Sequence, residues 1–377
     1  MSKRLVLLVG HSNPPIHGQS IQAAQLVSGS SDWQDIQIDA LNTVYSETRE
    51  GLSGASIWKV CKMVTYAFRL CARAIHNKPD AIIISPAFHF GAFLKDSLFI
   101  LIAKKICRAE VIAWIHMDPN RLQIDQQPKW FQIYCDYVVK QLDCLVGCAP
   151  SLAEKWPSFL NEIRVVSIPN GVVDDAHCNF VYDNGQSNEK LVIGYLSALD
   201  RQKGWRDFYQ ASINLCEIYP NVEFHLYGGV GADETLEGIE QVFASNPCSS
   251  RIVWHGATWG VEKNSAFQKM DLYCFPSHTE AFPLAVLEAM SFSLPIVLTD
   301  VGAVKDAVIE SQGGWICDAN NTPSLQTTLN EAISQQGRWN SMGEYNRQRY
   351  LDLFSVEAFI DCWHETLRDF LADSSRL

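Results

Sequence analysis

The stretch Met270–Asp300, MDLYCFPSHTEAFPLAVLEAMSFSLPIVLTD, contains two short apolar runs separated by a helical segment. The runs LYCFPS and PIVLTD have the length of buried strands, and Pro283 favours the first turn of a helix. We expect this helix to end near Ser291. Its residues are apolar on every side except at Glu288, which predicts a buried helix that carries one carboxylate. A strand, a helix and a second strand are the repeating unit of an α/β fold with a parallel sheet.

The same alternation of strands and helices runs through all 377 residues in two series, which is enough chain for two domains. A polar, acidic stretch from Asn170 to Lys190 separates the series. We therefore expect two Rossmann-like α/β domains with parallel sheets, at 1–171 and 190–354. A linker at 172–189 would join them, and a closing helix at about 355–377 would pack back near the first domain. The strand runs are RLVLLVG, DAIIIS, EVIAWIH, CLVGCAP and IRVVSIP, then KLVIGYLS, VEFHLYGG, RIVWHG, LYCFPS and PIVLTD.

The charge argues against a nucleic-acid partner. The chain carries a net charge of −12, and its first 172 residues hold 17 Lys and Arg against 14 Asp and Glu. The negative charge is thus concentrated in the second half. No basic motif interleaved with aromatic residues is present, so we expect no nucleic acid to bind.

The cysteines and the apolar runs indicate a cytoplasmic location. The twelve cysteines follow no regular framework, which is typical of reduced thiols, and Cys144 and Cys148 have no nearby histidine pair to complete a zinc site. The first residues, MSKRLVLLVGHSNPP, lead from a strand into a polar loop and do not have the pattern of a secretory signal. The most apolar run, SLFILIAKK, is cut short by lysines before it reaches the length of a membrane span.

Ligands of parallel sheets bind beyond the carboxyl ends of the strands, so the residues that follow each strand are candidates for a site. Arg201 and Lys203 follow the first strand of the second series, where two cations suit a phosphate. Backbone N–H groups near the start of the buried helix favour the same ligand. In the first series, Gly18 lies in the loop after the first strand, and His116 ends the strand EVIAWIH.

The two glutamates Glu280 and Glu288 lie eight positions apart among apolar residues. A buried carboxylate needs compensation from solvent, a basic partner or a ligand with hydroxyl groups. The residues alone leave an ion pair and a ligand site as alternatives.

A basic helix is predicted in the first domain. Between Gly51 and Asp80 there is no acidic residue, and apolar and basic residues fall on opposite faces at helical spacing. Such a helix either rests on an anionic membrane or is an ordinary core helix with a solvated basic face. The basic candidates are Lys59, Lys62, Arg69 and Arg73, and the apolar set is Ile57, Val60, Val64, Phe68 and Ile75.

Taken together, these residues resemble the retaining nucleotide-sugar glycosyltransferases of family 4, which have the GT-B architecture of two facing Rossmann-like domains with a cleft between them. The family's E-x7-E signature is present as Glu280 and Glu288. The supporting segments follow the family's order: IPNGVVD, RQKGW, YGG, HGATWG, MDLYCFPS and LTDVGAVKDAVIESQGGWIC.

The resemblance implies roles for these residues. Glu288 would accept hydrogen bonds from the ribose hydroxyls of the donor, and Glu280 would lie against the donor sugar. Lys203 would neutralise the diphosphate, His116 would face the sugar, and Gly18 would belong to the glycine loop of the first domain. The remaining donor-binding positions are Arg201, Ala281, Phe282, Pro283 and Leu284, of which Pro283 has no N–H to donate.

Three positions depart from the family pattern. Ala198 stands where the family usually has an arginine, and Arg201 is the candidate replacement. His17 precedes Gly18 where many members have a second glycine, and Ser293 stands where glycine is common. These departures concern the geometry of the phosphate and acceptor sites.

The implied function is transfer of a sugar, with retention of configuration, from a nucleotide-diphosphate sugar to a hydroxyl of a glycan or lipid-linked acceptor, in bacterial surface polysaccharide synthesis. UDP is favoured over GDP or ADP, and neither a metal nor another cofactor is expected. Peripheral contact with the inner face of the membrane is the alternative to a purely cytoplasmic location. Two other classes stay open: a nucleotide-sugar epimerase or hydrolase of the same fold, and a non-enzymatic nucleotide-sugar-binding protein.

Overall fold

The structure is a computed structural model, and it describes residues 3–10, 18–45, 57–86, 90–117, 124–153, 163–177, 190–246, 248 and 250–374. The chain forms two compact units. The first comprises Met1–Gly171 together with Val356–Leu377, and the second comprises Val172–Ser355. The chain therefore leaves the first unit once and returns to it for the last helix.

The first unit is built on a six-stranded parallel sheet with the order β2-β1-β3-β4-β5-β6. Its strands are β1 (Arg4–Gly10), β2 (Ile36–Asn42), β3 (Ala81–Ile84), β4 (Glu110–Ile115), β5 (Cys144–Gly147) and β6 (Arg164–Ser167). Its helices are α1 (Gly18–Gly29), α2 (Ile57–Asn77), α3 (Phe90–Leu101), α4 (Lys129–Val139), α5 (Pro150–Ala153) and α13 (Val356–Ser374), and a π-helical turn, η3 (Ile102–Ile106), follows α3.

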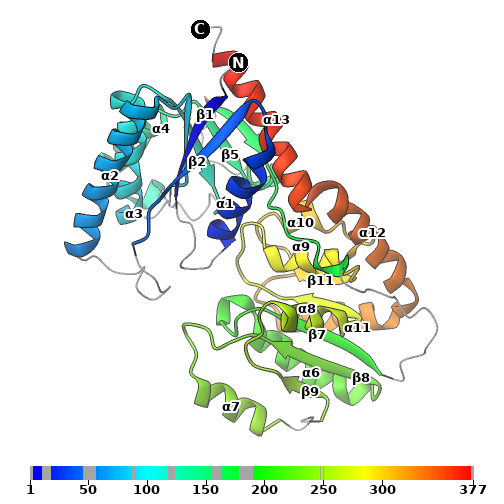
Figure 1. The fold of residues 1–377 in the computed structure, drawn as a ribbon. Helices are drawn as coiled ribbons and strands as arrows, with labels where there is room; N and C mark the ends of the chain where they lie inside the picture. Colours follow the sequence, from blue (N-terminus) through cyan, green and yellow to red (C-terminus); the bar gives the residue numbers. More distant parts are fainter. Residues whose placement is uncertain are drawn as a thin grey trace. The chain divides into compact units, whose positions relative to one another are not determined.

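Helices cover both faces of this sheet (Figure 1). On one face, α13 packs beside α1, and its Phe359, Trp363 and Leu367 join the same buried cluster as Val6 and Leu8 of β1. These three α13 residues recur every four positions, so they form one apolar stripe of the helix. On the other face, α2, α3 and α4 share a second buried cluster. The last helix thus completes the core of the first unit.

The second unit also has a six-stranded parallel sheet, with the order β12-β11-β10-β7-β8-β9. Its strands are β7 (Leu191–Leu196), β8 (Val222–Tyr227), β9 (Ile252–Trp254), β10 (Leu272–Phe275), β11 (Ile296–Thr299) and β12 (Gly314–Cys317). Its helices are α6 (Trp205–Ile218), α7 (Leu236–Ala244), α8 (Val261–Gln268), α9 (Leu284–Ser291), α10 (Val304–Ala307), α11 (Thr322–Ser334) and α12 (Trp339–Leu353).

Counted within the unit from the β9 edge, this order is 3-2-1-4-5-6, the order of dinucleotide-binding Rossmann sheets. The order reverses between β7 and β10, which are neighbours in the sheet. Connections leave these two strands toward opposite sides, which opens a crevice at their carboxyl ends where ligands bind. The loops after β7 and β10 therefore border this crevice.

The two Rossmann-like α/β domains expected from the sequence are confirmed. All ten apolar runs form strands, but two further strands, β2 and β12, were not predicted. Each lies at the edge of its sheet and pairs with one neighbour only. β2 alternates apolar and polar residues because one of its faces is exposed, and β12 is only four residues long. The polar residues of β2 interrupt its apolar run, and β12 is too short to form one, whereas the edge strands β6 and β9 do carry apolar runs.

Candidate functional site

The loops after β7 and β10 touch through their backbones. The β7 loop contains a 3₁₀ turn, Arg201–Lys203, which is capped by the Asp200 side chain and ends at Gly204. Gly204 has a φ of 71°, and a Cβ there would lie 1.9 Å from the carbonyl oxygen of Pro276 in the β10 loop. Only glycine allows this approach, so the turn that carries Lys203 lies directly against the loop that carries Glu280.

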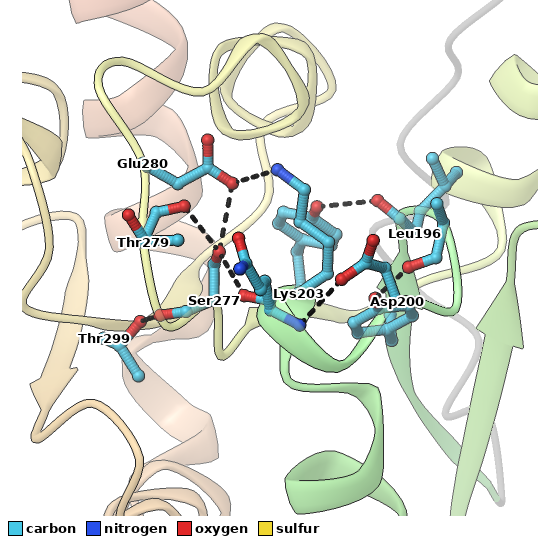
Figure 2. Close-up of polar contacts among 11 residues, drawn as sticks. Leu196, Asp200, Lys203, Ser277, Thr279, Glu280 and Thr299 are labelled. Carbon is cyan, nitrogen blue, oxygen red and sulfur yellow. Dashed lines mark hydrogen bonds and ion pairs between the residues drawn. The ribbon is translucent and has the colours of Figure 1, made fainter. Parts of the chain in front are cut away.

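This contact brings Lys203 and Glu280 together. The Lys203 ammonium donates a short hydrogen bond to Glu280 Oε1, and the hydroxyl of Ser277 donates to the same oxygen at 3.0 Å (Figure 2). The Lys203 side chain is 33% exposed and that of Glu280 is 12% exposed. A cation and a carboxylate therefore lie side by side at the reversal of strand order, with the lysine side chain partly exposed.

The loop after β10 is held in place from two sides. His278 Nε2 lies 2.6 Å from Asp207 Oδ2 of α6, and the His278 N–H donates to the Gln202 carbonyl at 2.8 Å. On the other side, the N–H of Ala303 donates to the Ala281 carbonyl at 2.9 Å. A side chain at Gly302 would collide with the Glu280 carbonyl, since its Cβ would lie 2.3 Å away. These contacts fix the backbone around Glu280 before any ligand arrives.

The buried helix predicted from the sequence is α9, with Pro283 as its N-cap residue. Val286, Leu287, Ala289 and Met290 are fully buried, as expected for a helix that is apolar on all sides. The backbone at Pro283 is extended, so the helix starts one residue later than the sequence predicted.

Glu288, the only charged residue of α9, forms an ion pair with Lys263 of α8. Lys263 Nζ lies 2.7 Å from Glu288 Oε1, and each side chain is 24% exposed. Burial raises the pKa of the Glu288 carboxyl, while the charge and hydrogen bond of Lys263 lower it. The ion-pair alternative is thus present in the structure, and the exposed quarter of Glu288 leaves surface for a ligand.

Lys263 was not among the residues predicted from the sequence. It lies 25 positions before Glu288, on a different helix. No local pattern links the two residues, because only the packing of α8 and α9 brings them together.

Arg201 lies beside acidic residues rather than beside Glu280. Its Nε is 3.7 Å from Glu234 Oε1 and 3.9 Å from Asp233 Oδ2, and its side chain is 68% exposed. Glu234 has a closer partner in Arg206, whose hydrogen bonds lower the pKa of Glu234. Arg201 is therefore only loosely held, and its closest charged neighbours are carboxylates.

Two of the predicted residues lie in the first unit. His116 follows β4, and its ring lies 4.4 Å from the ring of the fully buried Trp114. Gly18 is the first residue of α1. His17, which precedes Gly18, and Asp118, two positions after His116, lie outside the described residues.

The basic helix predicted between residues 51 and 80 is α2, and its orientation differs from that of an ordinary core helix. It buries Tyr66, Leu70 and Ala74 against the sheet. The hydrophobic residues that were expected to face the core are exposed instead: Ile57 85%, Val60 54%, Val64 58%, Phe68 73% and Ile75 67%. Helix α2 therefore packs on the core, but through a different face from the one that the core-helix alternative turned inward.

The basic residues of α2 are partly used within the first unit. Lys62 Nζ donates to the Val44 carbonyl at 3.1 Å, and Arg73 donates to the Ala40 carbonyl at 2.7 Å. Both contacts tie α2 to the end of the edge strand β2. Arg69 lies over the ring of Tyr66.

Membrane-spanning helices and metal-binding clusters are both absent from the described ranges. None of the helices there is both long enough and apolar enough to span a bilayer. No three His, Cys, Asp or Glu side chains in those ranges gather in a group that could hold a metal ion.

Residues 181–349, most of the second unit, match the family described as Glycosyl transferases group 1. The second unit is therefore similar to the domains of this family. Among curated proteins, the chain is 20% identical over 187 residues to the capsular polysaccharide biosynthesis glycosyltransferase CapM of Staphylococcus aureus, covering 50% of this chain and 48% of that protein. It is 26% identical over 213 residues to the alpha-galactosylglucosyldiacylglycerol synthase of Streptococcus pneumoniae, covering 54% of each. The chain thus spans about half the length of these relatives.

Among solved structures, the chain is similar to Alr3699/HepE from Anabaena in complex with UDP, with a TM-score of 0.68 and 15% identity. The match covers 97% of this chain and 100% of that one. At this identity the likeness shows the fold, and it confirms the GT-B class that the resemblance implied.

Proposed function

We propose that this chain is a retaining glycosyltransferase that moves a sugar from a nucleotide-diphosphate sugar to a hydroxyl of a glycan or lipid-linked acceptor. The observation that carries the proposal is the pairing of Lys203 and Glu280 at the reversal of strand order in the second sheet. That reversal is where nucleotides bind in Rossmann sheets, and it lies in the part of the chain that matches group 1 glycosyl transferases. The UDP bound to the Anabaena protein supports a uridine donor.

The proposed donor site uses both glutamates. Glu288 accepts hydrogen bonds from the two ribose hydroxyls, and Glu280 lies against the sugar. Lys203 and the N–H groups at the start of α9 face the diphosphate, since a helix N-terminus favours an anion. Arg201 is a second, more exposed cation on the same side. Gly18 and His116 are the proposed contribution of the first unit.

The proposed sugar transfer separates charge, and the site must stabilise that charge. As the bond between the anomeric carbon and the diphosphate oxygen breaks, positive charge develops on the sugar ring and negative charge on the leaving diphosphate. Lys203 and the α9 N–H groups stabilise the leaving group. The acceptor hydroxyl then forms its bond to the anomeric carbon on the face that the diphosphate vacates, and its proton passes to the departing phosphate oxygen. This course retains the anomeric configuration.

We propose that turnover needs no metal ion, because Lys203 supplies the positive charge at the diphosphate. Nucleoside diphosphate release is expected to be unchanged by EDTA and unaffected when Mg²⁺ or Mn²⁺ is added back. The measurement is the initial rate with a UDP-sugar and an acceptor extract. A rate that falls with EDTA and returns with Mg²⁺ would contradict metal independence without contradicting the transferase.

The test of the function compares donor turnover with and without acceptor. Purified protein is given UDP-, GDP- and ADP-sugars, and release of the nucleoside diphosphate is followed with an acceptor extract present or absent. A transferase releases the nucleotide rapidly only when acceptor is present. An epimerase or hydrolase converts the donor without acceptor, and a sensor binds the donor but never turns it over; either result would overturn the proposal.

A lipid-linked acceptor is supported by the surface of α2. Five apolar side chains form an exposed stripe along this helix, and Trp58, toward its basic side, is 66% exposed. Apolar patches of this kind are rare on surfaces that meet only water. On its other side the same helix carries Lys59, Lys62, Arg69 and Arg73, and the chain between Gly51 and Asp80 contains no acidic residue that would repel an anionic surface. An anionic membrane offers both an apolar layer and the opposite charge.

Replacement of Val64 and Phe68 by serine is expected to weaken binding to anionic vesicles by tenfold or more. Each side chain is worth about 1.5–3 kcal/mol when buried in lipid rather than exposed to water. Flotation with phosphatidylcholine vesicles, with and without phosphatidylglycerol, measures the effect. Ile218→Ser on α6, an exposed apolar residue of the second unit, is the matched control. If wild-type protein fails to float with the phosphatidylglycerol vesicles, α2 is not a membrane surface.

A further inference from the structure

We propose that Lys263 is a positioning residue of the donor site, which holds Glu288 as an oriented carboxylate ready to receive the ribose of the nucleotide. The inference rests on the proposed function, because it takes Glu288 as the ribose ligand. It assigns a role to a residue that neither the sequence pattern nor the family signature had singled out.

Lys263 is hydrogen-bonded to one carboxylate oxygen of Glu288. Lys263 lies in the first turn of α8, and its Nζ donates to Glu288 Oε1 at 2.7 Å. Among the described side chains no second donor to this carboxylate is found. Oε2 and the remaining lone pair of Oε1 are therefore left as acceptors, which matches the two hydroxyls that a ribose offers.

The other neighbours of Glu288 do not replace Lys263. Apolar residues of α9 bury it, and Asp175 in the turn Asp175–His177 adds a negative charge. From α12, Arg347 is already committed to Asp174, with contacts of 2.6 and 2.7 Å, and to the Ser291 carbonyl. Tyr273 on β10 donates its hydroxyl to the Leu196 carbonyl. Lys263 is therefore the cation that favours the charged form of Glu288.

Loss of Lys263 has a predictable electrostatic consequence. Burial and Asp175 raise the pKa of Glu288, and Lys263 opposes them. Without the lysine, the pKa of Glu288 rises further, and a larger fraction of the carboxyl is protonated near neutral pH. A protonated carboxyl loses acceptor capacity toward the ribose, so nucleotide binding should become dependent on pH.

A functional role also explains why the pair is present. A largely buried ion pair gains little net stability, because the desolvation of both charges offsets their attraction. An apolar residue at position 288 would suit the buried helix equally well. Such a pair is expected if a ligand needs the carboxylate, because the lysine then keeps that carboxylate ionised.

The experiment measures the affinity of the full chain for UDP by calorimetry from about pH 6 to about pH 9, since protonation linkage appears as a slope against pH. Wild-type affinity is expected to vary little over this range. Lys263→Met is expected to bind UDP about tenfold more weakly at neutral pH and to recover as the pH rises, which corresponds to about 1.4 kcal/mol. Lys263→Arg, which keeps the charge, should restore a flat profile.

Two controls separate positioning from other roles. Lys269→Met removes a lysine at the other end of α8 and should leave both affinity and slope unchanged. In a Glu288→Gln background, Lys263→Met should have no further effect, because the residue it acts through can no longer ionise.

The inference is overturned if Lys263→Met binds UDP as the wild type does, or if it weakens binding equally at every pH and also in the Glu288→Gln background. The last result would mean that Lys263 touches the nucleotide itself or merely supports the fold. Normal UDP binding by Glu288→Gln would instead remove Glu288 from the donor site, and the proposed function would lose its ribose ligand at the same time.

Discussion

The Glu288→Ala variant is expected to lose most of its nucleotide binding, with the affinity for UDP falling by about a hundredfold or more. Hydrogen bonds to a charged group contribute about 1.5–3 kcal/mol each, and the ribose offers two hydroxyls to this carboxylate. The loss of both bonds therefore exceeds the roughly 2.7 kcal/mol that a hundredfold change in affinity requires. Calorimetric titration with UDP, at constant salt and pH, measures the effect.

The Glu288→Ala variant also leaves Lys263 without its partner, and this must be separated from the loss of a ligand contact. An unpaired, mostly buried ammonium destabilises the fold. The double variant Glu288→Ala with Lys263→Met removes that charge and should recover thermal stability but not UDP binding. If Glu288→Ala binds UDP normally, the glutamate serves only as the structural partner of Lys263, and the donor-site assignment is wrong.

Methionine at Lys203 is expected to lower kcat by about a hundredfold to a thousandfold, the usual cost of removing one preorganised group that stabilises developing negative charge. Lys203 occupies the turn after β7 and lies against Glu280, so its ammonium is fixed before the diphosphate departs. UDP release at saturating donor and acceptor measures kcat, and UDP affinity should fall less than kcat does.

Arg201→Met provides the matched comparison for Lys203. Arg201 is 68% exposed and lies near Asp233 and Glu234, so its charge is partly neutralised and screened by water. We expect its removal to lower kcat by no more than about tenfold, because a solvated cation contributes less than a fixed one. The opposite order, with the larger loss in Arg201→Met, would show that Arg201 replaces the family arginine that is absent at Ala198.

The energetic coupling between Glu280 and Lys203 can be measured with single and double variants. Because Glu280 holds Lys203, loss of Glu280 changes both the sugar contact and the position of the ammonium. Comparing Glu280→Gln, Lys203→Met and the double variant gives the coupling between the two residues.

The regular part of the fold could be predicted from the sequence because strands buried on both faces leave an unmistakable apolar run. The helix α9 was predicted within one residue, since Pro283 restricts the backbone where the helix starts. The edge strands β2 and β12 could not be predicted in this way. In β2 the polar residues Gln37 and Asp39 interrupt the apolar run, and β12 is only four residues long, so neither strand shows a continuous apolar run of ordinary length.

By itself, the sequence determined the alternation of strands and helices, the two domains and the spacing of Glu280 and Glu288, because each depends on neighbours close along the chain. Only the tertiary structure decided which residues meet these groups. It brought Lys203 to Glu280 through the close approach at Gly204, and Lys263 to Glu288 through the packing of two helices. It also left the apolar stripe of α2 exposed to solvent. Periodicity shows that a helix has an apolar face, but long-range packing chooses the face that is covered.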